Sequence, residues 1–230
     1  MALLWKFLRN EAGEDEGLAD AGIETFRDAP FAGLARECGQ NSIDAARRSG
    51  PDGNVERVII RFWKETVPTE TVPDIAGFRA TIDACLSRAR NRRDDKEIQF
   101  FERARRIASA TEIDLLHVID EGTTGLIGPC EPGTPYHALI KAKGVSKKGD
   151  DTSGGSFGIG KNAAYAVSAL RSVFYSTVYE DSSGNNQFLA QAKAILVSHS
   201  KGPGQEHSAT GYWGEAENYM PAREPSQGLQ

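Results

Sequence analysis

The sequence predicts an α+β fold, a two-layer sandwich of helices on one mixed, mostly antiparallel sheet. Helical and strand patterns are mixed without the regular β-α-β order that builds a doubly wound parallel sheet. Two strand-like runs in the C-terminal half flank a short turn rich in Ser, Gly and Asn, which is typical of an antiparallel hairpin. The length of 230 residues suits one principal core, and no internal repeat is visible.

The first half of the chain contains a helix, a strand and a basic helical segment. Residues 30–48 place apolar side chains near helical spacing and stop at the turn 49–53, which predicts one amphipathic helix. The run 55–64 is rich in β-branched and aromatic residues, which predicts a strand. Residues 74–110 interleave apolar and basic side chains, which predicts two helices with a break near 91–95.

The second half contains a strand, a long irregular segment and the hairpin. Residues 113–121 predict a short buried strand that ends in acid and glycine. The segment 122–160 is rich in Gly, Pro, Ser, Lys and Asp, and such long loops usually carry function. We expect a helix over 161–170, the hairpin over 173–200, and a polar C-terminal extension over 201–230.

Composition excludes several classes of protein. The formal net charge of -5 gives no overall attraction to nucleic acid or to anionic membranes. The cysteines Cys38, Cys85 and Cys130 are odd in number and far apart, which argues against a disulfide framework and a cysteine zinc site. No apolar run reaches the roughly 18 residues of a membrane span, and the apolar start is too short for a secretory signal. We therefore expect a cytoplasmic protein without a membrane partner.

The predicted helix of residues 30–48 carries Glu37, Asn41 and Asp44 at positions i, i+4 and i+7, so these side chains share one face. Magnesium accepts an amide oxygen beside phosphate oxygens and water, which makes Asn41 the candidate metal ligand. Glu37, one turn earlier, is the candidate that orients or deprotonates an attacking water. A polar stripe of this kind is also typical of a solvated helix face, so this stretch alone does not identify a site.

The strand of residues 113–121 delivers Asp120 into a glycine turn. A buried carboxylate at that position accepts a hydrogen bond from the amino group of adenine and discriminates against guanine. Gly122 and Gly125 let the backbone pass close to a base or ribose. The alternative is an ordinary turn, because Asp, Glu and Gly are common turn residues.

A glycine-rich stretch then leads directly into a predicted helix. Closely spaced glycines expose successive backbone amides, and the positive end of the following helix completes a cradle for an anion. The alternative is a flexible linker, although linkers do not usually continue into an apolar helix. The candidate ligand-binding residues of this stretch are Gly155, Ser156, Phe157, Gly158, Ile159, Gly160 and Lys161.

The same stretch also matches part of a P-loop, since Gly155, Gly160 and Lys161 satisfy the GxxxxGK pattern. A P-loop requires Ser or Thr after the lysine to hold magnesium, and this chain has Asn162. A P-loop also requires a buried strand immediately before it, whereas residues 147–155 are polar and glycine-rich. A P-loop-like NTPase therefore remains the less favoured alternative.

Taken in order, the three stretches resemble the GHKL superfamily, which includes gyrase, the ninety-kilodalton heat-shock chaperone, histidine kinases and MutL. The helix motif of that superfamily is matched by Glu37, Asn41, Asp44 and Ala45. Its aspartate–glycine motif is matched by Asp120 and Gly122, and Gly125 stands one residue later than the usual second glycine. Its lid motif is matched by Gly155, Gly158 and Gly160, in the form most similar to the chaperone branch.

The resemblance implies a Bergerat-type ATP-binding domain over residues 1–200, with 74–110 as a helical insertion. It implies ATP and magnesium as cofactors, slow ATP hydrolysis, lid closure and ATP-dependent homodimerisation. In that scheme Glu37 is the general base, Asn41 binds magnesium and Asp120 selects adenine. A late-strand threonine that touches phosphate in many members has two candidates here, Thr177 and Thr210.

Two other readings remain open at the level of sequence. The alternative to an ATPase is an ATP-sensing or scaffolding module that binds ATP and closes with negligible turnover. The basic helices around residues 88–106 are a candidate contact for nucleic acid or for a protein partner, as in DNA-processing relatives. Acidic residues interspersed among these arginines favour an ordinary solvated face instead. DNA processing, chaperoning and defence are the settings in which such an ATPase module occurs.

Overall fold

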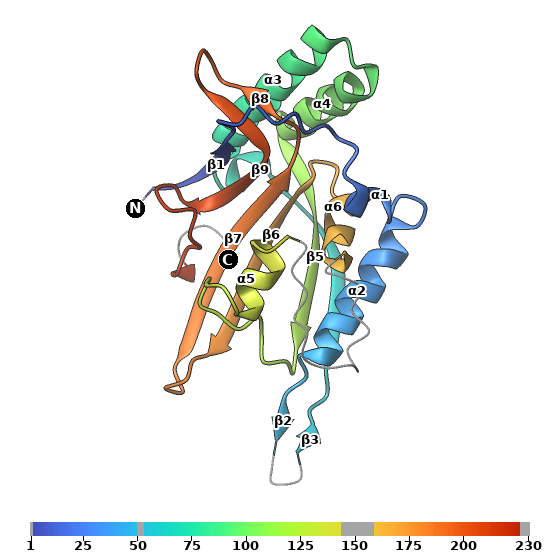
Figure 1. Cartoon of the computed structure of the whole chain (residues 1–230). Coiled ribbons are helices and arrows are strands. Elements are labelled where there is room, and N and C mark those ends of the chain that lie inside the picture. The colour runs from blue at the N-terminus through green and yellow to red at the C-terminus, as the bar shows by residue number, and fades with distance from the viewer. Residues whose placement is uncertain (1, 50–52, 144–158, 226–230) are drawn as a thin grey trace.

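The computed structural model describes residues 2–49, 53–143 and 159–225, and its fold belongs to the predicted α+β class (Figure 1). The helices are α1 (Ala21–Glu24), α2 (Pro30–Asp44), α3 (Ile75–Arg92), α4 (Asp95–Ala108), α5 (Pro135–Ile140) and α6 (Ala163–Val167), with 3₁₀ turns η1 (Thr69–Thr71) and η2 (Gly160–Asn162). The strands are β1 (Leu3–Arg9), β2 (Arg48–Ser49), β3 (Asn54–Val55), β4 (Ile59–Pro68), β5 (Glu112–Glu121), β6 (Ser172–Glu180), β7 (Asn186–Ile195), β8 (His199–Ser200) and β9 (Glu206–Glu215).

The main sheet is antiparallel, with the order β1-β9-β7-β6 and with β8 paired to β9. The predicted hairpin is confirmed, because β6 and β7 pair along their whole lengths. Asp181 organises its turn by accepting hydrogen bonds from the backbone N–H groups of Ser183 and Asn185, at 2.9 and 3.0 Å. Such side-chain caps are the reason that short Asp-, Ser- and Asn-rich turns are recognisable from sequence.

Strand β9 lies inside the main sheet, between β1 and β7, so the polar extension predicted from residue 201 is wrong for residues 206–215. Trp213 pairs with Trp5 on one side and with Ala192 on the other. Thr210, Tyr212 and Trp213 have high β propensity, so a local signal for this strand was present, but the glycines and polar residues around them concealed it. Pairing with two strands that are distant in sequence places them in the core.

Helices cover both faces of the main sheet, so the central strand β7 is buried on both sides. Ala190, Ala192 and Ala194 pack in one apolar cluster with residues of α3 and α4. Leu189 packs on the opposite face with α5, and Ile195 packs with α1 and α6. The α+β class is confirmed, but the helices do not form the single layer of the predicted two-layer sandwich.

Helices α3 and α4 confirm the helical segment and its predicted break. The carboxylate of Asp74 caps α3 by accepting from the N–H of Gly77 at 3.2 Å. The carboxylate of Asp94 caps α4 by accepting from the N–H of Glu97 at 3.0 Å. The apolar stripe of α3 packs on the main sheet, so the predicted insertion is an integral part of the core.

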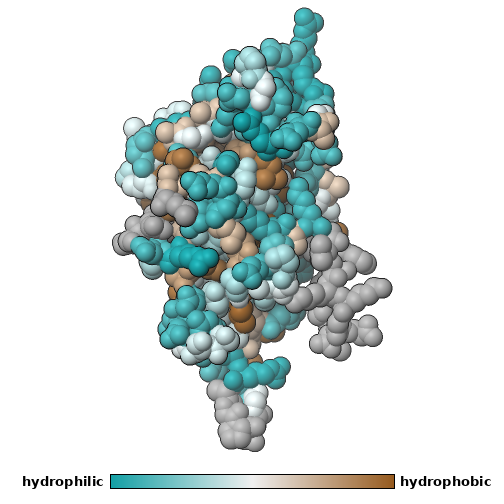
Figure 2. Space-filling model, turned by 60° about the vertical axis from the view of Figure 1, so that its left-hand side comes forward, coloured by the Kyte–Doolittle hydropathy of each residue, from teal (hydrophilic) through white to brown (hydrophobic). Residues whose placement is uncertain are grey.

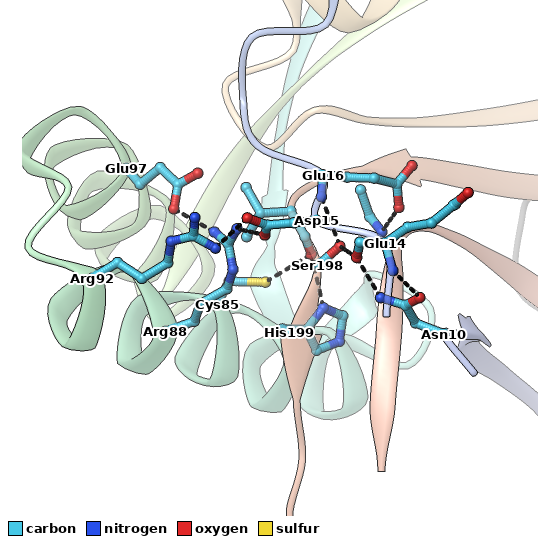
Figure 3. Close-up of polar contacts among 12 residues, drawn as sticks. Asn10, Glu14, Asp15, Glu16, Cys85, Arg88, Arg92, Glu97, Ser198 and His199 are labelled. Atoms are coloured by element: carbon cyan, nitrogen blue, oxygen red, sulfur yellow. Dashed lines mark hydrogen bonds and ion pairs between the residues drawn. The ribbon is translucent and has the colours of Figure 1, made fainter. Parts of the chain in front are cut away.

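An ionic cluster holds the N-terminal segment against α3 and α4 (Figure 3). Arg88 of α3 bonds Asp15 at 2.5 Å and Glu97 of α4 at 2.6 Å. Glu97 is only 5% exposed, so its charge depends on Arg88 for compensation. Nearby, Ser198 Oγ accepts a hydrogen bond of 3.0 Å from the backbone N–H of Glu16.

Strands β4 and β5 form a separate two-stranded antiparallel sheet that does not pair with the main sheet. The strand predicted at residues 113–121 exists, but the prediction that it is buried is wrong. Ile113 is the buried residue of β5, whereas Leu116 and Ile119 are 43% and 46% exposed. The ring of Trp63 stacks on that of His117, with centroids 4.6 Å apart. Alternating polar and apolar residues on two uncovered faces explain why a strand-like pattern did not imply burial.

The long segment 122–160 contains helix α5, which the sequence prediction missed. Thr134 caps this helix by accepting from the N–H of His137 at 3.2 Å, and Pro135 occupies its first turn. A capping threonine followed by proline is a helix-start signal that was present in the sequence. Helix α6 is shorter than predicted, because Ser168 ends it in an extended conformation and bonds Ser172.

The surface is mostly hydrophilic on the face that Figure 2 shows, with apolar residues in separate patches. Within the described ranges, no helix combines the length and the apolar character that crossing a membrane requires.

Candidate functional site

Helix α2 presents Glu37 to the end of the glycine-rich stretch. Glu37 has a side chain that is 24% exposed and pairs with Arg36 at 3.3 Å. A Cβ placed on Gly160 would lie 2.7 Å from the carboxyl carbon of Glu37 and would overlap one of its oxygens. The backbone at Gly160 can therefore approach this carboxylate only because glycine has no side chain. The first and third predicted stretches thus meet in space.

The carboxylate of Asp120 is joined to the same helix. Ser42 Oγ of α2 donates a hydrogen bond of 2.8 Å to Asp120 Oδ2 at the end of β5. Among the described residues, no donor occupies the other carboxylate oxygen of Asp120. Asp120 is exposed, whereas the sequence predicted a buried carboxylate; the difference arises because β5 pairs only with β4.

Cys38 lies in the electrostatic field of both acids. Burial raises the pKa of its thiol to about 11, and the negative charges of Asp120 and Glu37 add to that increase. The thiol is therefore a poor nucleophile and packs as a small apolar group against α6 and its neighbours. The shared influence on Cys38 is an independent sign that the acids of α2 and β5 border one region.

The two glycines after Asp120 have positive φ angles, of 78° at Gly122 and 69° at Gly125. The carbonyl of Gly122 accepts from the N–H of Arg47 at 3.0 Å, which ties this turn to the residues after α2. A Cβ on Gly125 would lie 2.9 Å from Thr177 Oγ1. Thr177 Oγ1 also accepts from the N–H of the residue after Gly125, at 2.8 Å.

The two late-strand threonines are therefore distinguished by position. Thr177 of β6 contacts the second glycine of the aspartate–glycine stretch. Thr210 of β9 instead accepts a hydrogen bond of 3.1 Å from Lys143 Nζ. Thr177 is the threonine that the structure brings to the candidate site.

The remaining predicted residues differ in what they contact. Asp44 is exposed and accepts from Gln40 Nε2 at 2.8 Å. Asn41 is also exposed, and its side-chain amide makes no hydrogen bond to any part of the chain that the structure describes. Ile159 packs against the cluster that contains Phe26. The predicted binding residues Gly155, Ser156, Phe157 and Gly158 lie outside the described residues.

Lys161 is bonded to the C-terminal end of α5. Its Nζ donates to the carbonyl of Ala138 at 3.3 Å and to the carbonyl of Ala142. Burial lowers the pKa of this amine, and the charge of Lys143 lowers it further. An amine with these properties gains from an anionic partner.

The donor set suits magnesium better than a transition metal. No group of three or more His, Cys, Asp or Glu side chains in residues 2–49, 53–143 and 159–225 could hold a metal ion. Magnesium needs few protein ligands, because it retains water and takes phosphate oxygens. The free amide of Asn41, one turn after Glu37, fits that role. Two surface hollows of about 400 and 370 Å³ lie elsewhere, beside α3, and none of the site residues lines them.

Sequence reasoning missed two residues that shape the site. Ser42 connects α2 to Asp120, and Cys38 is influenced by the charges of both Asp120 and Glu37. Cys38 and Ser42 are four residues apart and lie on the same inward face of α2 as Leu34. The helical period of the sequence could therefore have identified them as inward-facing residues. The partner of Ser42 was not predictable, because Asp120 is 78 residues away.

Comparison of the chain with protein-family models, curated proteins and solved structures found no match.

Proposed function

We propose that this chain binds ATP with magnesium and hydrolyses it slowly, as the resemblance to the GHKL superfamily implies. The observation that supports the proposal most strongly is the contact between the Glu37 carboxylate and Gly160. A candidate base on a helix and the end of a glycine-rich phosphate cradle are 123 positions apart in sequence, yet they are adjacent in space. The bond from Ser42 to Asp120 adds the third stretch to the same region.

In the proposed reaction, Glu37 orients a water molecule and accepts its proton during attack on the terminal phosphate. Asn41 would hold magnesium through its side-chain amide oxygen, and the bound ion would neutralise charge at the phosphate oxygens. Ser42 donates to only one carboxylate oxygen of Asp120. The other oxygen accepts a hydrogen bond from the amino group of adenine. Lys161 exchanges the carbonyls of α5 for phosphate oxygens.

Hydrolysis is coupled in this proposal to closure of the glycine-rich lid and to formation of a homodimer. Nucleic acid is not part of the proposal. Arg88 and Arg92 pair with Asp15, and Arg90 pairs with Glu102 at 3.0 Å, so much of the basic character of α3 is neutralised within the chain. Such internal pairing favours the structural role of these arginines.

The decisive experiment measures phosphate release and ATP binding separately. Glu37→Ala should abolish magnesium-dependent phosphate release while calorimetry still detects ATP binding. If the unmodified chain binds ATP but releases no phosphate above background, the sensing or scaffolding function replaces the enzymatic one. If neither ATP nor its non-hydrolysable analogue gives any heat with magnesium, the proposal is wrong.

A matched pair of glycine variants tests the geometry. Gly160→Ala introduces a Cβ that displaces the Glu37 carboxylate, so phosphate release should fall at least about tenfold. Gly39→Ala is the control, on the helix α2 that carries Glu37, because a Cβ on Gly39 meets no atom within 4 Å. Equal activity of the two variants would contradict the role of this contact.

A further inference from the structure

Four lysines from separate parts of the chain gather around the C-terminal end of α5. One lies on β7, one is the C-cap of α5, one lies two residues after that cap, and one lies in η2 at the end of the glycine-rich stretch. Figure 1 shows α5 lying over β7 and β6, on the sheet face opposite α3. We call these residues the lysine cluster: Lys141, Lys143, Lys161 and Lys193.

Two members of the lysine cluster donate to the last carbonyls of α5. Lys193 is only 3% exposed, and its Nζ donates to the carbonyl of Ile140 at 2.8 Å. Lys161 Nζ donates to the carbonyls of Ala138 and Ala142. These acceptors are neutral peptide groups that carry only a partial negative charge.

The other two members also lack a charged partner. Lys141 Nζ donates to the carbonyl of Tyr219 at 2.6 Å and lies 3.5 Å from the ring centre of Tyr212. Lys143 Nζ donates to Thr210 Oγ1 at 3.1 Å. None of the ion pairs formed within the described ranges includes a member of the lysine cluster.

The charges of the cluster act on one another. Burial lowers the pKa of Lys193 to about 7, and the charges of Lys143, Lys161 and Lys141 contribute in that order. Within the residues that the structure describes, the carboxylate of Asp20 opposes this decrease, and its effect is the smallest of those acting on Lys193. Four amines that repel one another inside a fold need an anion to be stable together in their charged form.

We infer that the lysine cluster is a binding site for an oligophosphate group. Ammonium groups are compact charges with several donors each, which suits the oxygens of an anion that carries more than one negative charge. Inorganic oligophosphate and the phosphate tail of a nucleotide present the same chemistry. The nucleotide source rests on the proposed function, because Lys161 directly follows Gly160, which contacts Glu37.

Calorimetry with sodium tripolyphosphate, without magnesium and in phosphate-free buffer, tests the site on the whole chain. Lys193→Met and Lys143→Ala should each weaken tripolyphosphate binding at least about tenfold, as expected for loss of a charge-assisted hydrogen bond. The exposed Lys96 of α4 is the matched control, and Lys96→Met should bind like the unmodified chain. Because Lys143 is exposed, its variant decides the question if Lys193→Met fails to fold.

Absence of tripolyphosphate binding, or binding that neither cluster variant weakens, would overturn the inference. A competition arm identifies the source of the phosphate. If ATP displaces tripolyphosphate and Lys193→Met weakens both, the cluster holds the tail of the nucleotide. If both ligands bind at once, the site serves a separate oligophosphate. If tripolyphosphate binds and ATP does not, the proposed function fails while the lysine site stands.

Discussion

Replacing Lys193 with methionine removes a buried amine whose pKa is unusually low in the folded chain. Burial and the neighbouring lysines lower that pKa from 10.5 to about 7. Between these values the unfolded chain keeps a proton that the folded chain has lost, so stability rises with pH in this window. At 1.36 kcal/mol per pKa unit, the full effect of Lys193 is on the order of 5 kcal/mol, and it is present as a penalty below pH 7.

Urea denaturation in phosphate-free buffers at pH 7 and pH 10 measures this effect. The unmodified chain should gain on the order of 3 kcal/mol relative to Lys193→Met between the two pH values, because most of the penalty disappears over that range. The carbonyl of Ile140 loses its donor in the variant, at a cost of about 1 kcal/mol that does not depend on pH. Lys96→Met corrects for general effects of removing a lysine. A difference between the unmodified chain and Lys193→Met that stays constant from pH 7 to pH 10 would refute the reasoning.

Three further predictions concern stability and reactivity. Gly125→Ala should cost at least about 1–2 kcal/mol in urea denaturation, because alanine is strained at a φ of 69° and its Cβ meets backbone and hydroxyl oxygens; an unchanged midpoint would contradict this. Arg88→Met should cost about 3–5 kcal/mol by leaving the buried Glu97 unpaired, whereas Arg92→Met at the exposed end of the cluster should cost less than about 1 kcal/mol. Similar losses for the two variants would show that Glu97 does not depend on Arg88. Cys38, with its pKa raised to about 11, should react with iodoacetamide at pH 8 roughly a hundredfold more slowly than a free cysteine, as peptide mapping can measure.

Elements with local signals were predictable. Aspartates that cap α3 and α4 mark their starts, and the turn at Asp181 marks the β6–β7 hairpin. The missed helix α5 also had a local signal in Thr134 and Pro135. Capping and turn chemistry involve residues a few positions apart, so they can be identified without knowing the fold.

The sequence by itself determined the α+β class, the two helices of residues 74–110 with their break, and the order of the candidate motifs. The helix predicted over 30–48 begins where expected but ends at Asp44. Only the tertiary structure decided that β9 is an inner strand, that the two-stranded β4–β5 sheet is separate, and that helices cover both faces of the main sheet. It also decided that Glu37 touches Gly160, that Ser42 reaches Asp120, and that the lysine cluster converges on α5. The reason is physical: helix and turn preferences are set by neighbouring residues, whereas burial and charge contacts depend on residues that only the folded chain brings together.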